Sequence, residues 1–210
     1  MKVSAVKKPL DAQIDTLQED NLQIYLRLLE KWQPKINLVS GQQDVNSYWE
    51  RHFVDSAQLA ALVNTNDKTC VDLGSGGGFP GLVLAITTDL HVTLIESDQR
   101  KCSFLRTVSR ETNANTEVVN SRIEGVEPMQ SCPDIITARA LAPLLELLNY
   151  CFILFPAMSK AHTRLLFLKG AQWESEIKDA QKHYKFEFKK HQSVTHNEAQ
   201  VLEISSVRPI

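Results

Sequence analysis

The sequence lacks the features that mark membrane, secreted and metal-binding proteins. Among its 210 residues, no apolar run approaches the length that spans a membrane, and the first residues contain no apolar secretory core. Its four cysteines lie far apart without a C-x-x-C pair, which argues against a disulfide framework and against a metal site. We therefore expect a cytoplasmic protein with no membrane contact and no bound metal.

The sequence also lacks a strong excess of charge of one sign, and it lacks internal repeats. The chain has 23 lysines and arginines against 25 acidic residues, a formal net charge of −2. Any contact with nucleic acid must therefore rest on a local cluster of cations. Hydrophobic residues make up 43% and charged residues 23%, and there are no repeats or low-complexity tracts, which fits one α/β domain with a small extension.

Glycine is scarce, and five of the eight glycines fall within residues 74–81. The surrounding stretch predicts a buried strand, a glycine turn and the start of a helix: Cys70-Val71-Asp72-Leu73-Gly74-Ser75-Gly76-Gly77-Gly78-Phe79-Pro80-Gly81. Glycine lets a ligand approach the backbone closely, and the free N–H groups of a helix start face such a ligand. The sequence therefore predicts a ligand-binding turn, with a glycine-rich surface loop as the alternative.

The register of the glycines distinguishes two cofactors. A dinucleotide pattern, G-x-G-x-x-G, fits residues 76–81, but it begins two residues late for a turn that adjoins the strand. The adjoining register starts at Asp72 and reads D-x-G-x-G-x-G, which resembles the S-adenosylmethionine turn of class I methyltransferases. The next predicted strand, residues 91–96, ends in Glu96, at the offset where an acid meets ribose hydroxyls. Both cofactors carry a ribose, so Glu96 does not separate them.

Strand-like and helical patterns alternate after the turn. Strands are predicted at residues 70–73, 91–96, 116–120, 134–138 and 164–168, with helices at 80–88, 98–112, 122–128 and 142–158. Residues 184–193 and 199–206 then read as an antiparallel hairpin. The predicted fold is α/β, a mostly parallel Rossmann-like sheet with a C-terminal antiparallel hairpin, which resembles that of class I S-adenosylmethionine-dependent methyltransferases.

Residues 1–64 are predicted to form a helical extension packed on a core domain at residues 65–210. One helix is expected to end at Pro34, and a second to run from an N-cap at Asp44 to about residue 63. The second helix carries Arg51 and His52 near its apolar stripe. A surface ion pair between Arg51 and Asp55 is the alternative interpretation.

Cations follow two of the predicted strands. Because ligands of such sheets bind at the carboxyl ends of the strands, Arg139 and Lys169 are candidates to meet a carboxylate or a phosphate. Each by itself is equally consistent with a surface charge. No base-amine methylation motif follows residue 138, and Cys132 stands at the wrong end of its strand for thiolate chemistry. A target that is already nucleophilic, such as guanine N7, would need positioning alone, so no catalytic residue is assigned.

Several blocks resemble the bacterial 16S ribosomal RNA guanine-N7 methyltransferase family, also called glucose-inhibited division protein B. The resemblance covers about residues 20–205. It rests on the glycine turn through Phe79-Pro80-Gly81 and on these blocks: Lys31-Trp32, Asn37-Leu38-Val39-Ser40, Arg51-His52-Phe53-Val54-Asp55-Ser56, Arg100-Lys101, Phe104-Leu105, Ser121-Arg122-Ile123-Glu124, Thr137-Ala138-Arg139-Ala140 and Leu168-Lys169-Gly170. An Arg-His pair that the family often has before its last strand is replaced here by Asn197-Glu198-Ala199-Gln200, to which no role is assigned.

The resemblance implies transfer of a methyl group from S-adenosylmethionine to N7 of one guanine in the decoding region of 16S ribosomal RNA. Matching positions would bind the cofactor: Gly74, Gly76, Phe79, Glu96, Ile123, Glu124 and Arg139. Others would face the RNA: Arg51, His52, Arg122 and Lys169. The expected partner is 16S ribosomal RNA within a 30S subunit or an assembly intermediate, met by a monomer. A methyltransferase of a small molecule or protein, and an NAD-binding oxidoreductase or non-catalytic nucleotide-binding module, remain as alternatives.

Overall fold

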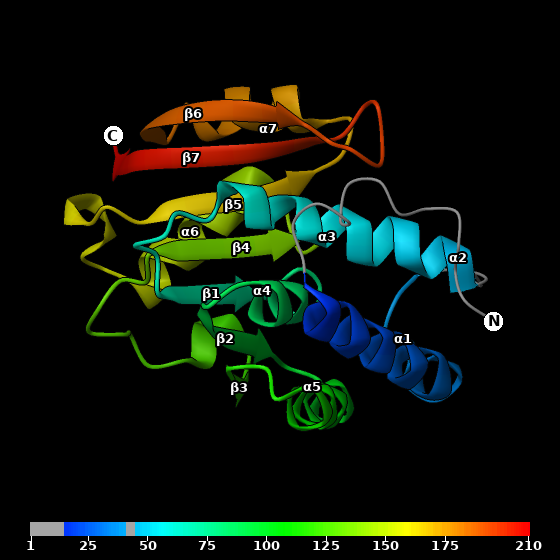
Figure 1. Ribbon diagram of the computed structural model, residues 1–210. Helices are drawn as coiled ribbons and strands as arrows, with labels where there is room; N and C mark the ends of the chain where they lie inside the picture. The colour runs from blue at the N-terminus through cyan, green and yellow to red at the C-terminus, as the bar shows by residue number, and fades with distance from the viewer. Residues whose placement is uncertain (1–14, 41–44) are drawn as a thin grey trace.

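The computed structural model describes residues 15–40 and 45–210, and its centre is a seven-stranded sheet (Figure 1). The strand order is β3-β2-β1-β4-β5-β7-β6. Strands β1 to β5 are parallel, and β7 runs antiparallel to both of its neighbours. The strands are β1 (Thr69–Leu73), β2 (His91–Glu96), β3 (Thr116–Asn120), β4 (Ile135–Arg139), β5 (Arg164–Lys169), β6 (Tyr184–Gln192) and β7 (Gln200–Pro209). The predicted α/β fold with its terminal hairpin is therefore confirmed.

Helices cover both faces of the sheet (Figure 1). On one face, α1 (Thr16–Ile36), α4 (Gly81–Thr87) and α5 (Gln99–Thr112) share a hydrophobic core with the helical segment at residues 45–62. On the opposite face, α6 (Leu144–Leu154) and α7 (Trp173–Ala180) close a second core. Alternate residues of the strands supply the two cores, because side chains on a strand point to opposite faces.

The first helix extends beyond the proline that was predicted to end it. It begins at a capping box, in which the Asp15 carboxylate accepts from the N–H of Gln18 and the Gln18 side chain accepts from the N–H of Asp15. Pro34 lies inside the helix, which runs to Ile36 and has its C-cap at Asn37, where φ is 45°. The Gln33 side chain accepts from the N–H groups of the two residues after Asn37. These hydrogen bonds stabilise the end of the helix, which does not stop at Pro34.

The second predicted helix is a succession of different helical turns. Residues 45–62 form α2 (Val45–Tyr48), a π-helical segment (Trp49–Val54), α3 (Asp55–Ala57) and a 3-10 segment (Gln58–Leu62). Its predicted N-cap, Asp44, lies outside the described residues. The apolar stripe predicts the buried side chains of Trp49, Phe53 and Ala57 correctly. Periodicity does not reveal the wider π turn, which carries Arg51 and His52.

Two further helix predictions need correction, and one helix was not predicted. The helix expected at residues 122–128 is a single 3-10 turn, Ile123–Gly125. Pro128 follows, and the residue before a proline is disfavoured in helical conformation. The helix expected at residues 142–158 is shorter, running from Leu144 to Leu154, and α7 was not predicted at all.

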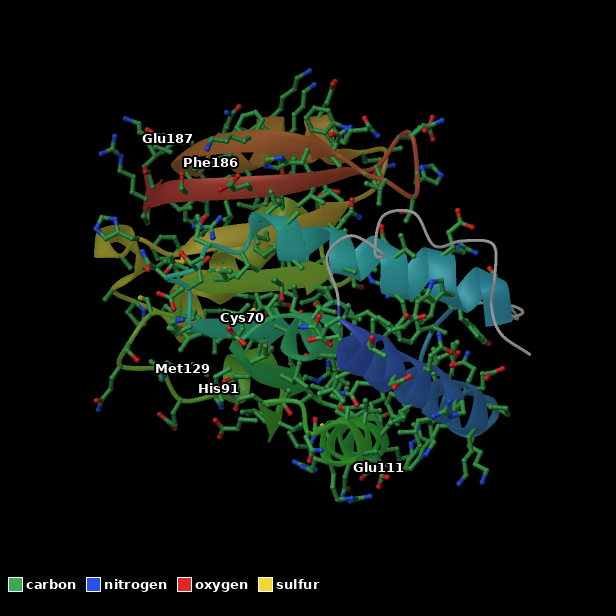
Figure 2. All side chains as sticks on the ribbon, viewed as in Figure 1. Cys70, His91, Glu111, Met129, Phe186 and Glu187 are labelled. Atoms are coloured by element: carbon green, nitrogen blue, oxygen red, sulfur yellow. The ribbon has the colours of Figure 1, made fainter. Side chains whose placement is uncertain are left out.

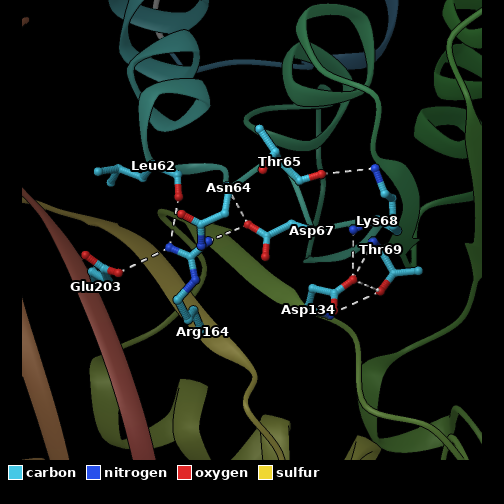
Figure 3. A network of polar contacts seen from close by, with 9 residues as sticks. All are labelled: Leu62, Asn64, Thr65, Asp67, Lys68, Thr69, Asp134, Arg164 and Glu203. Atoms are coloured by element: carbon cyan, nitrogen blue, oxygen red, sulfur yellow. Dashed lines mark hydrogen bonds and ion pairs between the residues drawn. The ribbon is translucent and has the colours of Figure 1, made fainter.

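A polar network holds the segment before β1 against the amino ends of the strands (Figure 3). Arg164 on β5 donates to the carbonyl of Leu62 at 2.8 Å and pairs with the carboxylates of Asp67 and Glu203. Asp134 accepts from the N–H groups of residues 68 and 69, both at 2.9 Å. This network fixes one end of the sheet and leaves the carboxyl ends of the strands for a ligand.

The cysteines and the helices add no further site. Figure 2 places Cys70 on β1 inside the molecule, and Phe186 and Glu187 on the outer strand β6. Burial raises the pKa of the Cys70 and Cys151 thiols well above the ordinary value, so both stay protonated. Within residues 15–40 and 45–210, no helix has the length and apolarity for a membrane crossing, and no three side chains of metal-ligating type cluster together.

Candidate functional site

The turn after β1 takes left-handed backbone at three glycines. Gly74, Gly76 and Gly78 have φ values of 62°, 57° and 96°, conformations that other residues adopt at a cost. A Cβ atom on Gly78 would lie 2.6 Å from the Tyr25 hydroxyl, so the backbone there is packed against α1. Among the described residues, a Cβ atom on Gly76 would meet only the carbonyl oxygen of Gly74, at 3.8 Å. The turn is therefore closed towards α1 and open at Gly76.

Tyr25 on α1 supports this turn from beneath. Its hydroxyl donates to the carbonyl of Gly77, and its ring stacks on Phe79 with the centroids 5.1 Å apart. Tyr25 is fully buried, and burial raises the pKa of its hydroxyl, which keeps the proton available for donation. The first helix therefore contributes directly to the geometry of the predicted cofactor turn.

Glu96 at the end of β2 adjoins the same turn. One oxygen accepts from the N–H of Gly76 at 2.8 Å, and the other accepts from the N–H of Asp98 at 2.7 Å. A carboxylate has about four lone-pair positions, so Glu96 can accept further hydrogen bonds from ribose hydroxyls. The predicted pairing of glycine turn and strand-end acid is thus present in three dimensions.

A cavity of about 540 Å³ lies above the turn, at the carboxyl ends of the strands. Ten of the eleven site residues that the sequence predicts line it: Arg51, His52, Gly74, Gly76, Phe79, Glu96, Arg122, Ile123, Glu124 and Arg139. Unpredicted residues also line it, including Leu38, Ser97, Lys101, Leu141 and Tyr150. Lys101 belongs to the block Arg100-Lys101, which carries the family resemblance, and that block could have indicated that Lys101 lies at the site.

The eleventh residue, Lys169, lines a second cavity of about 630 Å³. The two cavities share part of their lining, Arg51, Arg139, Ala140 and Leu141. The ammonium of Lys169 lies 2.5 Å from a carboxylate oxygen of Glu176 and donates to the carbonyl of Ala142 at 2.9 Å. Glu176 was not predicted, because the helix that carries it was not recognised.

Arg139 occupies the wall between the cavities. Its guanidinium donates to the carbonyl of Arg51 at 3.0 Å, pairs with Asp55 at 3.4 Å and lies 5.0 Å from the centre of the Phe79 ring. Asp55 also accepts from the hydroxyl of Thr195 in the β6–β7 connection, at 2.7 Å. The carboxylate that was a candidate partner for Arg51 therefore pairs with Arg139 instead.

His52 faces the first cavity as a neutral ring. Burial, with the nearby charges of Arg139 and Arg51, lowers its pKa to about 3. The ring is 8% exposed, and neither nitrogen has a hydrogen-bond partner among the described residues. Buried polar atoms without partners are uncommon, so a ligand in this cavity would restore a missing hydrogen bond.

Asp72 lies beneath the turn with no exposed surface. One carboxylate oxygen accepts from the Thr137 hydroxyl at 2.8 Å, and burial raises the pKa of the group to about 6. A carboxyl whose pKa is raised by folding takes up protons on folding between the unfolded and folded pKa values. Its contribution to stability is therefore complete below the unfolded pKa of 3.8 and is lost as the pH rises from there through about 6.

We predict that this loss is measurable against an Asp72→Asn variant, which cannot ionise. The free energy of unfolding of the wild type, relative to the variant, should fall by about 3 kcal/mol between about pH 3 and pH 7 and then level off. Urea unfolding across this pH range measures the difference. The stability of the wild type relative to Asp179→Asn, a change at an exposed position, should show no such fall, because both proteins retain Asp72. A wild-type curve parallel to that of Asp72→Asn would show that the carboxyl titrates normally.

The lining of the first cavity fits S-adenosylmethionine, a nucleoside with a zwitterionic amino-acid arm. Gly76 offers backbone without a side chain, Glu96 offers an acceptor for ribose hydroxyls, and Ile123 offers an apolar contact for a base. His52 adds a polar atom without a partner. Comparison with known proteins points to the same cofactor.

A sequence model of the family described as GidB, rRNA small subunit methyltransferase G, matches residues 18–205. Among curated relatives named ribosomal RNA small subunit methyltransferase G, the Paramagnetospirillum magneticum protein is 44% identical over 188 residues. That alignment covers 90% of this chain and 88% of the relative. The Gluconobacter oxydans protein is 49% identical over 161 residues, covering 77% of this chain and 79% of the relative.

Solved structures of other proteins share the fold. The chain matches M. jannaschii TYW2 in complex with AdoMet with a TM-score of 0.57 at 14% identity, covering 77% of this chain and 78% of the other. It matches a SAM-dependent methyltransferase from Aquifex aeolicus with a TM-score of 0.57 at 15% identity, covering 76% and 93%. At this level of identity the likeness concerns the fold alone.

Proposed function

The chain belongs to the GidB family of rRNA small subunit methyltransferases G, and from this premise we propose that it transfers a methyl group from S-adenosylmethionine to N7 of a guanine in 16S ribosomal RNA. The observation that carries the proposal is the pair of adjoining cavities with a common wall at Arg139 and Leu141. One cavity adjoins the glycine turn, and the other provides room for a base beside it.

The first cavity is the proposed cofactor site. Its residues with that role are Gly74, Gly76, Phe79, Glu96, Ile123, Glu124 and Arg139. When bound, S-adenosylmethionine supplies a methyl group on a positively charged sulfur, which makes that methyl electrophilic. Glu96 accepts from the ribose hydroxyls, and the open backbone at Gly76 allows close approach.

The chain's task in the transfer is to position the base. Guanine N7 carries a lone pair in the ring plane, so no proton has to leave before attack. Holding N7 in line with the methyl group therefore suffices, and no side chain is required as a general base. The proposed RNA contacts are Arg51, His52, Arg122 and Lys169, of which all but Lys169 line the first cavity.

We propose that the protein binds, as a monomer in the cytoplasm, to a small ribosomal subunit or to one of its assembly intermediates. A net charge of −2 offers little general attraction for RNA phosphates. A folded particle adds shape and protein contacts to the few cations around the cavities.

A labelling experiment tests the proposed function. The chain is incubated with S-adenosylmethionine that carries a labelled methyl group and with small subunits from cells that lack the protein. We expect label in 16S ribosomal RNA, at the N7 position of one guanine when the RNA is digested and mapped. Parallel reactions contain total RNA, a protein extract and a metabolite extract. Label that enters only protein or metabolites would refute the proposal.

A further inference from the structure

The proposed target atom restricts how the base can be recognised. The commonest protein contact to guanine is a bidentate arginine on O6 and N7, and it would occupy the atom that receives the methyl group. Recognition must therefore use the opposite edge of the base, which presents an N1–H donor, an exocyclic amine donor and the O6 acceptor. A site for that edge needs a carboxylate beside a cation.

Two carboxylates line the second cavity, Asp55 and Glu176. Both oxygens of Asp55 are engaged, one by Thr195 and Gln58 and the other by Arg139. In Glu176, one oxygen accepts from the N–H of Leu144 at 2.7 Å and contacts Lys169. The other oxygen, Oε1, has no hydrogen-bond partner in the described part of the chain. Glu176 is therefore the carboxylate with acceptor capacity to spare.

Lys169 provides the matching donor. An ammonium has three N–H groups, and those of Lys169 serve the carboxylate of Glu176 and the carbonyl of Ala142, which leaves one. The side chain is only 9% exposed, and that of Glu176 is 19% exposed. Both groups are thus held in place before a ligand arrives, which lowers the entropy lost on binding.

We propose that the Lys169–Glu176 pair reads the identity of the target base in the second cavity. Glu176 accepts from N1–H and the exocyclic amine of guanine, and Lys169 donates to O6. This inference rests on the proposed function, because it assumes that guanine is the base. The five-membered ring, which carries N7, remains free to face the wall that the two cavities share.

The same pair rejects adenine. Adenine presents an amine where guanine has O6, so a donor would face the ammonium of Lys169. Its N1 is an acceptor and would face the carboxylate of Glu176. Both contacts are repulsive, and unpaired polar groups in a partly buried site strengthen the discrimination. Hypoxanthine keeps O6 and N1–H but lacks the exocyclic amine, so it should bind with intermediate affinity.

Nucleotide binding tests the inference directly. Guanosine, inosine and adenosine 5′-monophosphates are titrated into the full chain saturated with S-adenosylhomocysteine, and their affinities are measured by calorimetry or by competition in NMR. For the wild type, we expect guanosine monophosphate to bind about tenfold more tightly than adenosine monophosphate. Glu176→Gln should reduce this preference to about twofold, since an amide puts a donor beside N1–H.

A matched control and a second variant distinguish recognition of the base from a purely structural role, in which Glu176 and Lys169 only hold the loop after β4 in place. Asp179→Asn on the same helix, at an exposed ion pair with Lys182, should keep the wild-type preference. Lys169→Gln should also lose preference for O6-bearing bases. Equal weakening of all three nucleotides by Glu176→Gln, or an unchanged preference, would overturn the inference. Failure of the wild type to methylate ribosomal RNA would instead overturn the proposed function, in a separate assay.

Discussion

Replacing Gly76 with valine is expected to reduce the affinity for S-adenosylmethionine by at least about 100-fold while the sheet remains folded. Gly76 has a φ of 57°, and within the part of the chain that the structure describes a Cβ atom there would have one neighbour within 4 Å, a carbonyl oxygen at 3.8 Å. The branched side chain therefore projects into open space beside the first cavity instead of into protein. Left-handed backbone at a non-glycine residue adds a cost of about 1–2 kcal/mol.

Calorimetric titration with S-adenosylhomocysteine measures the loss, and thermal unfolding confirms that the variant is folded. Gly170→Ala is the matched control, because a Cβ atom on Gly170 would meet no described atom within 4 Å and its φ is not positive. Gly78→Ala should behave differently, since its Cβ would collide with Leu82 and the Tyr25 hydroxyl, and should lower stability. Full affinity in a folded Gly76→Val variant would show that the cofactor does not lie over this turn.

Arg139→Ala is expected to lower the rate of methyl transfer at least about 100-fold and the free energy of unfolding by about 3 kcal/mol. The guanidinium is 16% exposed and the carboxylate of Asp55 is 17% exposed, so the pair is largely removed from water. Removing one partner leaves the other charge uncompensated, which is more costly than never forming the pair. The variant also loses the contact with Phe79 and the wall between the two cavities.

Urea unfolding and single-turnover transfer with saturating cofactor give the two quantities separately. Arg100→Ala serves as the control, because Arg100 is 68% exposed and, in residues 15–40 and 45–210, pairs only with Asp98, two residues away. A double-mutant cycle with Asp55→Ala then divides the effect. If Asp55→Ala alone impairs transfer as strongly as Arg139→Ala, Arg139 acts chiefly by holding Asp55, and its proposed contact with the ligand is wrong.

Local patterns predicted the parts of the site that are close together in sequence. The strand, the glycine turn and the start of α4 occupy one stretch, and Glu96 follows at a spacing set by one helix and one strand. Such patterns depend on backbone geometry within a few residues, so they can be recognised in a single chain. The matching blocks extended the prediction to Arg51, His52 and Arg122, which line the same cavity as the turn.

Contacts between distant segments were not predictable in this way. The ion pair of Arg139 with Asp55 joins residues 84 positions apart, and nothing in either local sequence specifies the partner. Glu176 was missed because α7 has only eight residues. The π-helical segment was missed because its apolar stripe resembles that of an ordinary helix. The ion pair was missed because it depends on tertiary packing, and the two helical segments because their local signals are short or ambiguous.

Through Tyr25, the first helix affects the shape of the cofactor turn, although no residue of this helix lines the first cavity. Its hydroxyl donates to the carbonyl of Gly77, and its ring stacks on Phe79, so the spacing between the helix and the glycine turn sets the backbone shape of that turn. A substitution that moves this helix by a fraction of an ångström would thus alter the bound state at a distance. Residues that never touch the nucleoside can in this way affect turnover. A chain shortened to remove the first helix would also lose the contacts of Tyr25 with Gly77 and Phe79.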